Sequence, residues 1–465
     1  MTGIVLLLAY ALLTIVTTVL FTRQEQNNES FHVADRNMGT TKSAMSIAAT
    51  WIWAPALLVS AEQAYTNGFP GVFWFIVPNV LCLMIFIPFA KKIRQQMPNG
   101  ITLSGYMGEK YQSKKVKDIY MVQLGGLAVL STGVQLLAGA KILTMVTGLP
   151  FFWLTVILAA ITYAYSQFSG IRASVLTDVV QMAIMLIACA IFVPWILRTN
   201  NGADALVKGL LSNSGQLAGI FSEKGLKVLF AFGLPTAIGL ISGPFGDQCF
   251  WQRAFCINRR KIGRAFVLGA VIFAVVPLSM AVIGFVAAGS GYAAADKSVV
   301  NLELITHLLP AWATIPFVLM LISGLMSTLD SNLCAIASLT TDLQVTGKLD
   351  DHGKVRISRL SMALLLVAGI LIANIPGLTV TNLFMIYGIL RATTLVPTVL
   401  TLLGKKLTAN AVFAGVLAAL VVGLPLFAYG TLKGISACKT IGCLATLGCA
   451  ALGCLLVTSI EKRRA

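Results

Sequence analysis

The residues best suited to bind a small cation lie in the apolar segment 312–341, which contains the run GLMSTLDSN. The hydroxyls of Ser327 and Thr328, with a backbone carbonyl one turn earlier at Gly324, would supply several oxygen ligands to an ion such as sodium. Serine and threonine in membrane helices also bond to their own backbone or join neighbouring helices, so this pair alone leaves both roles open. Asp330 favours the functional role, because a carboxylate inside a membrane span is costly and marks a functional site by default.

The stretch Lys42–Gly68 could complete such a site, because it is an apolar helix with a breaker in its middle. Pro55 removes a backbone donor and frees a carbonyl one turn back. Free backbone groups at membrane depth are tolerated only where they are buried in protein or line a wet cavity. Interrupted helices of this kind form ion and solute sites in secondary transporters. The alternative is that this stretch is a proline-kinked helix whose polar residues at one end have hydrogen-bond partners.

Other charged side chains also lie in or beside apolar segments. Asp178 could pair with Arg172, stabilise a helix N-terminus with its negative charge, or lie on an ion path. Asp247 and Arg253 are six residues apart, so we expect no direct pair, and we expect Arg253 to anchor its helix at the membrane surface. Arg391 lies mid-span and needs a partner, which is either a carboxylate of this chain or a solute.

The composition excludes most other classes of protein. Of 465 residues, 57% are hydrophobic and 11% are charged, against about 25% charged in a soluble domain. The net charge of +17 comes from Lys and Arg in short loops beside apolar spans, which is typical of a membrane protein rather than a nucleic-acid-binding one. Nine cysteines without a CxxC pair and three histidines predict neither a disulfide framework nor a zinc site. The sequence contains no GxxxxGK[ST] motif for a nucleotide and no nucleophile–base set, so we expect no enzyme.

The apolar runs predict an all-α polytopic membrane protein with about thirteen spans, each of the ~20 residues needed to cross the hydrocarbon. The predicted spans are 3–22, 43–66, 71–90, 119–147, 150–167, 173–197, 227–252, 264–289, 312–341, 359–376, 379–403, 409–429 and 435–458. The first run has no basic residue before it, so we interpret it as a helix rather than a signal peptide. Basic residues fall mainly in alternate loops, which predicts an outside N-terminus and a cytoplasmic C-terminus.

The spans also suggest an internal repeat. Spans 43–66 and 227–252 each begin a group of five, and their predicted orientations are opposite. Each contains a helix breaker, Pro55 in the first and Pro244 with its neighbouring glycines in the second. Interrupted helices in matching positions of two halves predict a transport site. We therefore expect one transport domain over 1–465, divided into an extra helix at 3–22, repeats at 41–198 and 226–404, and two extra helices at 409–458.

Four motifs resemble those of the sodium/solute symporter family. They are SAEQ at Ser60–Gln63, GIRASVLTDVVQ at Gly170–Gln181, DQxxWQR at Asp247–Arg253 and GLMSTLDS at Gly324–Ser331. The resemblance extends from about Phe31 to Lys406 and is nearest in pattern to the urea-transporter branch. It implies a leucine-transporter-like fold, in which two inverted five-helix repeats alternate access to the two sides of the membrane.

The resemblance also implies where ions bind. By position, the ligands of one sodium ion would be the carbonyls of Ala56, Val59 and Gly324 and the hydroxyls of Ser327 and Thr328. Some family members hold a further cation, and the matching positions here are Asp178, Ser327, Asp330 and Ser331. Asp330 stands where those members have a hydroxyl, and two carboxylates would favour a tightly held cation or a shared proton.

The resemblance says less about the substrate. Leu58 stands where sugar carriers have an asparagine and proline carriers an aspartate, which argues against both substrates. Gln63, Trp53 and Arg391 are the candidates for contact with a solute. The implied function is sodium-coupled symport of a small polar solute, urea-like first, across a cell membrane. The alternative is a proton-coupled, organic-anion or amino-acid symporter of the same fold. A channel is less favoured, and so is a transporter-like sensor, because we expect no signalling domain.

Overall fold

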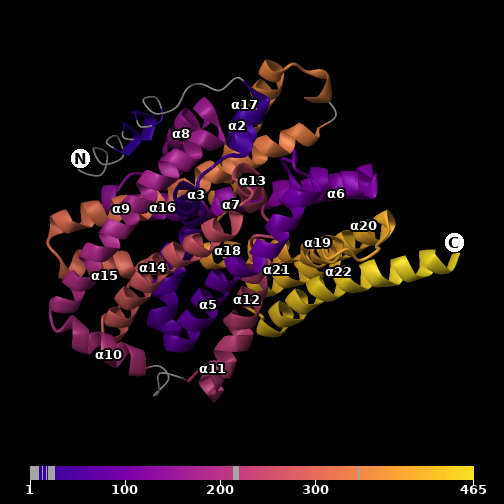
Figure 1. Ribbon diagram of the computed structural model, residues 1–465. Coiled ribbons are helices and arrows are strands. Elements are labelled where there is room, and N and C mark those ends of the chain that lie inside the picture. Colours follow the sequence, from indigo (N-terminus) through magenta and orange to yellow (C-terminus); the bar gives the residue numbers. More distant parts are fainter. Residues whose placement is uncertain are drawn as a thin grey trace.

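The computed structural model describes residues 10–12, 14–16, 18, 27–212, 219–343 and 346–464, and these ranges are almost entirely helical (Figure 1). Apolar sequence at membrane depth folds this way because a helix satisfies its own backbone hydrogen bonds. Hydroxyl side chains cap several helix starts, for example Ser113 at Val116 N–H and Thr379 at Asn382 N–H.

Within the described ranges, eleven helices are long and apolar enough to cross a membrane. Seven are single helices: α5 (Val59–Gln96), α7 (Lys114–Thr147), α8 (Phe151–Ser169), α9 (Ile171–Arg198), α14 (Ile262–Gly289), α17 (Asp351–Ala373) and α22 (Ser436–Arg464). Four are composite: α11 (Glu223–Val228) with α12 (Leu234–Ile241), α16 (Thr314–Leu339) with its flanking turns, α18 (Val380–Ala392) with α19 (Leu395–Leu402), and α20 (Ala409–Ala418) with α21 (Leu424–Leu432). The shorter helices are α2 (Asn28–Val33), α3 (Thr40–Trp51), α4 (Ala54–Leu57), α6 (Leu103–Tyr111), α10 (Gly202–Ser212), α13 (Gln248–Cys256) and α15 (Val300–Leu308).

The predicted class is confirmed, whereas the count of thirteen spans is not. The predicted span 3–22 lies mostly outside the described residues. The predicted spans 43–66 and 71–90 became α3, α4 and α5, with helical geometry lost near Ile52 and again at Gly68, whose φ is 66°. No uninterrupted helix therefore covers 43–66. The predicted boundary between 150–167 and 173–197 is present at Gly170, where a Cβ would lie 2.3 Å from the carbonyl oxygen of Phe31.

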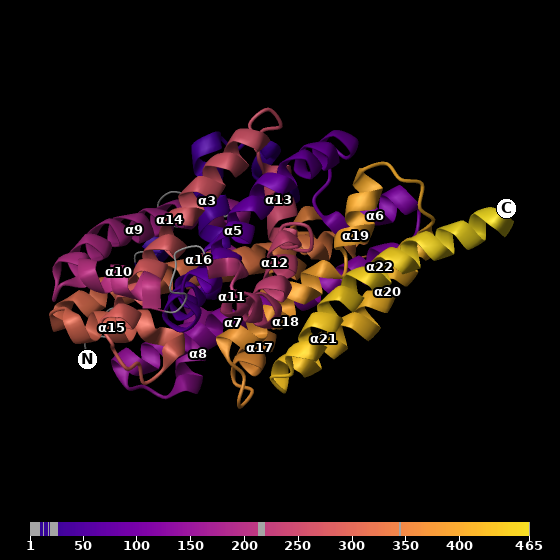
Figure 2. The same cartoon turned by 90° about the horizontal axis from the view of Figure 1, so that it is seen from below.

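The interrupted helices lie at the centre of the molecule. In Figures 1 and 2, α3, α13 and α16 occupy the middle, while α20, α21 and α22 lie together along one flank. The second interruption falls where the sequence predicts it, between the end of α12 at Ile241 and the start of α13 at Gln248. Trp51, Trp53 and Trp251 are among the largest fully buried side chains, so the core is centred on these interruptions.

Helices α5 and α14 pack closely along the first of these interruptions. Ser60 Oγ donates a hydrogen bond to the carbonyl of Pro277, whose ring interrupts the hydrogen bonding of α14. Two turns further along α14, a Cβ at Gly284 would lie 2.3 Å from the carbonyl oxygen of Ala61. The two helices thus meet with backbone against backbone.

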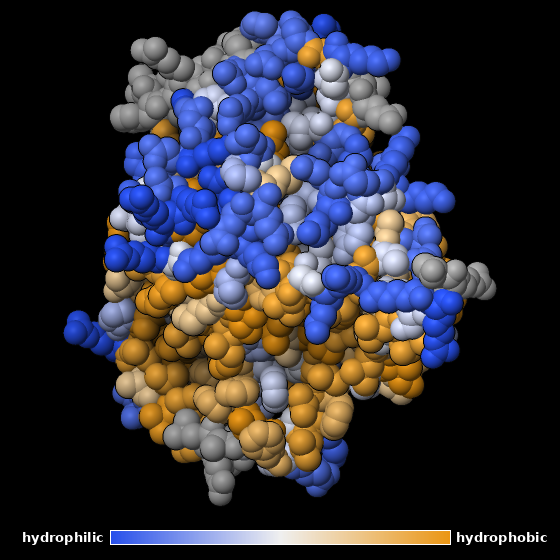
Figure 3. Space-filling view, turned by 45° about the vertical axis from the view of Figure 1, so that its right-hand side comes forward, coloured by the Kyte–Doolittle hydropathy of each residue, from blue (hydrophilic) through white to orange (hydrophobic). Residues whose placement is uncertain are grey.

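The surface is divided as a membrane protein requires. Figure 3 shows hydrophilic side chains gathered at the upper end, where α2 and α6 lie in Figure 1, above a broad hydrophobic region. Exposed large apolar residues are frequent on the long helices, for example Ile187 on α9 at 61% and Leu371 on α17 at 67%. Exposed apolar side chains in such numbers fit a lipid-facing surface.

Candidate functional site

The first interruption begins at the last turn of α3. In an unbroken helix, the Ala54 N–H would bond to the carbonyl of Thr50, but it donates instead to Gln135 Oε1 on α7, at 2.8 Å. Pro55 follows and has no N–H. The Ala56 N–H turns back to the carbonyl of Trp53, at 2.9 Å. The carbonyl of Thr50 therefore loses its usual helical partner, whereas that of Ala49 still accepts the Ile52 N–H at 3.0 Å.

Two hydroxyls of α16 reach these carbonyls. Ser327 Oγ lies 2.9 Å from the carbonyl oxygen of Ala49 and 2.8 Å from that of Gly324. Thr328 Oγ1 lies 3.1 Å from the carbonyl oxygen of Thr50 and 3.3 Å from that of Ile52. All of these residues are buried. The interruption and α16 thus bring six oxygens together: the two hydroxyls and the carbonyls of Ala49, Thr50, Ile52 and Gly324.

The structure brings Gly324, Ser327 and Thr328 together as the sequence indicates, but with other carbonyls than expected. Ala56 lies within α4 and Val59 begins α5, both beyond the interruption, whereas the hydroxyls contact the turn before it. Helical geometry ends at Trp51, before the proline rather than at it. The sequence marks Pro55 as the breaker but does not show that the chain unwinds ahead of it.

A second buried polar cluster lies next to this site. Asp178 Oδ2 accepts hydrogen bonds from Ser46 Oγ at 2.6 Å and from Arg253 Nη2 at 3.0 Å. The same Nη2 donates to Ser331 Oγ at 2.7 Å, and Ser331 Oγ lies 2.9 Å from Thr50 Oγ1. Arg253 is 2% exposed. The expectation that Arg253 anchors its helix at the membrane surface is therefore wrong, because α13 carries it inward to a buried carboxylate.

Asp330 is the second carboxylate of this cluster. Its oxygens accept hydrogen bonds from Ser174 Oγ at 2.8 Å, Thr177 Oγ1 at 3.0 Å and the Tyr165 hydroxyl at 3.1 Å. Of the four positions predicted for a second cation, Asp178, Asp330 and Ser331 are thus close together and fully buried, and Ser327 belongs to the site described above. Arg253 supplies one positive charge among two carboxylates, and its guanidinium already contacts both Asp178 and Ser331.

Arg391 lies in a third cluster, at the second interruption. Its Nη2 forms an ion pair with Asp247 Oδ2 at 2.8 Å, so the carboxylate partner considered for Arg391 is Asp247. The centre of its guanidinium lies 5.1, 5.0 and 4.5 Å from the ring centroids of Trp51, Trp53 and Tyr387. Such cation–π contacts stabilise a buried guanidinium. Two of the predicted solute contacts, Trp53 and Arg391, therefore touch each other.

Glycines let the second interruption approach this cluster. A Cβ at Gly246 would lie 2.5 Å from the carbonyl oxygen of Arg391, and one at Gly243 would lie 2.3 Å from the ring of Trp51. Real Cβ atoms are not found at such distances, so both positions require the absence of a side chain. The glycines thus hold the turn between α12 and α13 directly against the first interruption.

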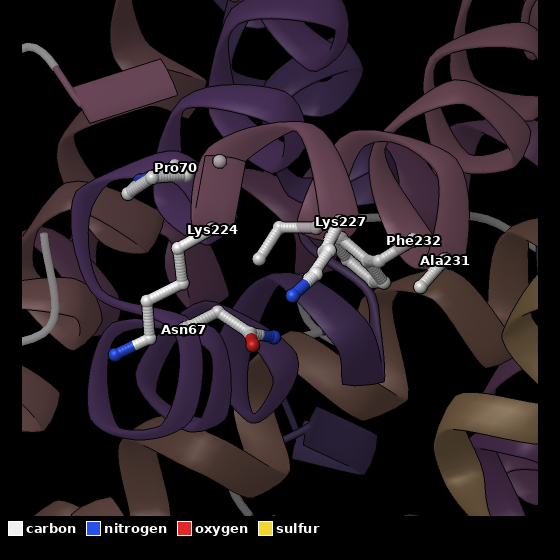
Figure 4. A pocket seen from close by; sticks show the side chains of 8 residues that line it. Asn67, Pro70, Lys224, Lys227, Ala231 and Phe232 are labelled. Carbon is white, nitrogen blue, oxygen red and sulfur yellow. The ribbon is translucent and has the colours of Figure 1, made fainter. Parts of the chain in front are cut away.

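Gln63 is placed elsewhere. Its Oε1 accepts a hydrogen bond from Asn67 Nδ2 at 2.7 Å, two turns along α5 from the Trp53 cluster. Asn67 lines a cavity of about 270 Å³ together with Lys224 and Lys227 (Figure 4). Gln63 is thus linked to the cavity through Asn67, and its predicted contact with a solute stays a prediction.

Comparison with known proteins identifies the family. The pattern of the sodium:solute symporter family matches residues 31–419, which is most of the chain. This chain belongs to the sodium:solute symporter family. Its members are transporters, which agrees with the expectation that this protein is not an enzyme.

Two curated relatives of this symporter illustrate the range of the family. It is 22% identical over 436 residues to the urea-proton symporter DUR3 of Oryza sativa subsp. japonica, covering 86% of this chain and 60% of the rice protein. It is 24% identical over 413 residues to the sodium/pantothenate symporter of Escherichia coli strain K12, covering 86% of this chain and 84% of that one. The chain thus spans less than two thirds of the rice protein's length.

The fold of the symporter agrees with that of a solved structure. A Na+-coupled sialic acid symporter in a substrate-bound, outward-open state superimposes with a TM-score of 0.74 at 12% identity, covering 97% of this chain and 98% of that one. The all-helical, leucine-transporter-like fold predicted from the sequence is therefore confirmed. The symporter is a multi-pass membrane protein, as its spans indicate.

Proposed function

We propose that this symporter couples the import of a small polar solute, urea-like first, to the movement of sodium. The observation that carries the proposal is the meeting of six oxygens between the interruption after α3 and the middle of α16. Uncharged carbonyl and hydroxyl oxygens suit a monovalent, weakly held cation, and the guanidinium of Arg253 in the neighbouring cluster is engaged by Asp178. Sodium bound there would join α3 to α16, and coupling requires only that it favour one state of the carrier over another.

The solute is assigned to Trp53 and Arg391, because they lie where the two interruptions meet. Gln63, beside Asn67, is assigned to the approach rather than to the site itself. The similarity to a urea-proton symporter supports urea or a related solute, while the similarity to a pantothenate symporter supports a larger carboxylate. We favour the urea-like solute because Asp247 already balances the charge of Arg391.

We also propose an outside N-terminus, a cytoplasmic C-terminus and location in the cell membrane. The hydrophilic end that bears α2 and α6 in Figures 1 and 3 agrees with the basic loops expected to face the cytoplasm. The two repeats, 41–198 and 226–404, each open with an interrupted helix, and the helices from 409 to 458 are proposed to lie outside them.

A proton is the second candidate for the coupling ion. The rice relative is a urea-proton symporter, and the buried Asp330 gives this chain one more carboxylate than Arg253 balances. A second sodium ion at Asp178 and Ser331 would have to displace the guanidinium that contacts both residues.

Uptake of labelled urea into proteoliposomes tests the proposal. One set has an inward sodium gradient, a second has potassium in place of sodium, and a third has an inward proton gradient in potassium. Accumulation above equilibrium only with sodium is expected. Accumulation driven by protons alone would replace sodium with the second candidate. If neither urea nor pantothenate accumulated in any of the three sets, both coupling ions would be rejected for these solutes.

A further inference from the structure

Arg391 and three buried side chains around it carry hydrogen-bond donors that make no hydrogen bond of standard geometry within the described residues. They are Trp53, Gln135, Tyr387 and Arg391, and the atoms concerned are Trp53 Nε1, Gln135 Nε2, the Tyr387 hydroxyl, and Arg391 Nε and Nη1. Each of the four side chains is at most 3% exposed. A buried donor without a partner costs roughly 1–3 kcal/mol, so a group of them in one place requires a cause.

These donors belong to one site built from two helices, α7 and α18, and the interruption that contains Trp53. The Trp53 and Tyr387 rings are 4.8 Å apart at an angle of 77°, and the Arg391 guanidinium lies over both. Gln135, from α7, joins them through its amide oxygen, which accepts the N–H of Ala54 next to Trp53. That bond fixes the amide so that its NH2 group is the part left without a partner.

The charge of the site is already balanced. Asp247 pairs with Arg391 through Nη2, so guanidinium and carboxylate together are neutral. A carboxylate entering the site would bring a negative charge without a positive charge to match it, and burying an unmatched charge is costly. A neutral solute that brings an acceptor oxygen satisfies the donors without that cost.

We infer that the site of Trp53, Gln135, Tyr387 and Arg391 selects a small, neutral, planar solute by the carbonyl oxygen that it presents to these unused donors. The aromatic faces of Trp53 and Tyr387 suit a flat solute, and its own N–H groups have an acceptor at Asn79 Oδ1, which is likewise buried and without a partner in the described part of the chain. Asn79 belongs to the same region, since its carbonyl accepts the Trp51 indole N–H at 3.1 Å.

This inference rests on the proposed function, because it names the solute class of the proposed solute site. The cavities near Asn67, Asp342 and Phe230 are lined by other residues.

A binding experiment without any ion gradient tests the inference separately from coupling. Purified full-length protein in saturating sodium is titrated with urea, acetamide, acetate and guanidinium, and binding is followed by calorimetry. Urea and guanidinium have nearly the same shape, but only urea carries an acceptor oxygen; acetamide and acetate differ mainly in charge. We expect urea and acetamide to bind at least tenfold more tightly than guanidinium and acetate.

Two conservative variants assign the binding to these donors. Tyr387→Phe removes only the unused hydroxyl, and Gln135→Glu keeps the oxygen that holds Ala54 while it replaces the unused NH2 group with an acceptor and adds a buried negative charge. Each is expected to weaken urea and acetamide binding about fivefold or more, in line with the loss of one hydrogen bond. Tyr120→Phe is the matched control, since that buried hydroxyl already lies 2.9 Å from Thr398 Oγ1, and its binding should be unchanged.

Three results would overturn the inference: equal binding of guanidinium and urea, tighter binding of acetate than of acetamide, or no binding of either carbonyl solute. Unchanged affinity in both Tyr387→Phe and Gln135→Glu would also overturn it. Carbonyl solutes that bind as expected but are not accumulated under a sodium gradient would support the inference and reject sodium coupling.

Discussion

Ser327 Oγ lies 2.9 Å from the carbonyl oxygen of Ala49, a residue 278 positions earlier in the chain. Thr328 makes the matching contact with Thr50, also 278 positions earlier, at 3.1 Å. Consecutive hydroxyls on α16 thus meet consecutive carbonyls on the last turn of α3. This contact is the basis of the proposed ion site.

The first prediction concerns these hydroxyls. Ser327→Ala and Thr328→Ala each remove one oxygen from the proposed sodium shell. Each should raise the sodium concentration for half-maximal uptake by about tenfold, while the maximal rate at saturating sodium falls less. Uptake measured in proteoliposomes over a series of sodium concentrations checks this.

Ser323→Ala is the matched control for both variants. Ser323 lies one turn earlier on α16, is equally buried, and donates its hydroxyl to the carbonyl of Leu319 within its own helix at 2.8 Å. Its sodium dependence should equal that of the unmodified protein. The same sodium dependence in all three variants would remove the ion from this position.

A second prediction concerns the buried pair of Asp178 and Arg253. Arg253→Met should lower the free energy of unfolding by about 3–5 kcal/mol, because it leaves two buried carboxylates without a guanidinium. Adding Asp178→Asn should recover part of that loss, since the pair would then be removed together. Thermal unfolding in detergent measures both effects.

The exposed pair of Asp351 and Lys354, 3.4 Å apart, provides the comparison for the buried pair. Lys354→Met should change stability by at most about 1 kcal/mol, because solvent screens an exposed pair. If Arg253→Met proved as mild as Lys354→Met, the buried pair would have no structural importance.

A third prediction tests the close approach of the two interruptions. Gly246→Ala should destabilise the protein by about 1–3 kcal/mol, since its Cβ would lie 2.5 Å from the carbonyl oxygen of Arg391 and forces a backbone shift. Gly448→Ala on α22 meets nothing within 4 Å and should be neutral or slightly stabilising. Equal melting temperatures for the two variants would contradict the packing described here.

A fourth prediction concerns pH and His32 on α2. Burial lowers the pKa of His32 to about 3, compared with about 6.5 in an unfolded chain. Between these values the unfolded chain binds a proton that the folded chain does not. The contribution of neutral His32 to stability is therefore complete above about pH 6.5 and is lost as the pH falls toward 3.

His32→Gln isolates this effect, because glutamine does not titrate. Between pH 7.5 and 5, the melting temperature of the unmodified protein should fall by several degrees more than that of His32→Gln. Identical pH dependence in the two proteins would show that His32 is protonated without unfolding.

The sequence predicts the fold well because membrane spans leave a strong local signal. About twenty apolar residues must form a helix at membrane depth, and this rule recovers α7, α9 and α14 to within a few residues. It fails inside 43–66, where the chain leaves helical geometry near Ile52, whereas the break at Gly68 falls in the predicted loop between 66 and 71. Hydropathy does not register such interruptions, since the residues around them are equally apolar.

The site was only partly predictable for a different reason. Ser327, Thr328 and Gly324 were recognisable from their residue types, but their partners on α3 depend on where that helix unwinds, and the Ala54 N–H freed there is accepted by Gln135 on another helix. The partners of Arg253 and Arg391 were likewise not predictable from spacing. The sequence places Asp247 nearest to Arg253, yet the fold pairs Arg253 with Asp178 and Asp247 with Arg391.

The backbone contact between α5 and α14 limits how the molecule can open. Helices this close, with Ser60 bonded to Pro277 and Gly284 against Ala61, cannot slide past one another without first separating. A rearrangement that exposes the solute cluster must therefore carry both helices as one rigid body. The boundary along which that body moves then lies between α3 and α16. A covalent cross-link between α5 and α14 would therefore leave transport intact, whereas a cross-link between α3 and α16 would stop it.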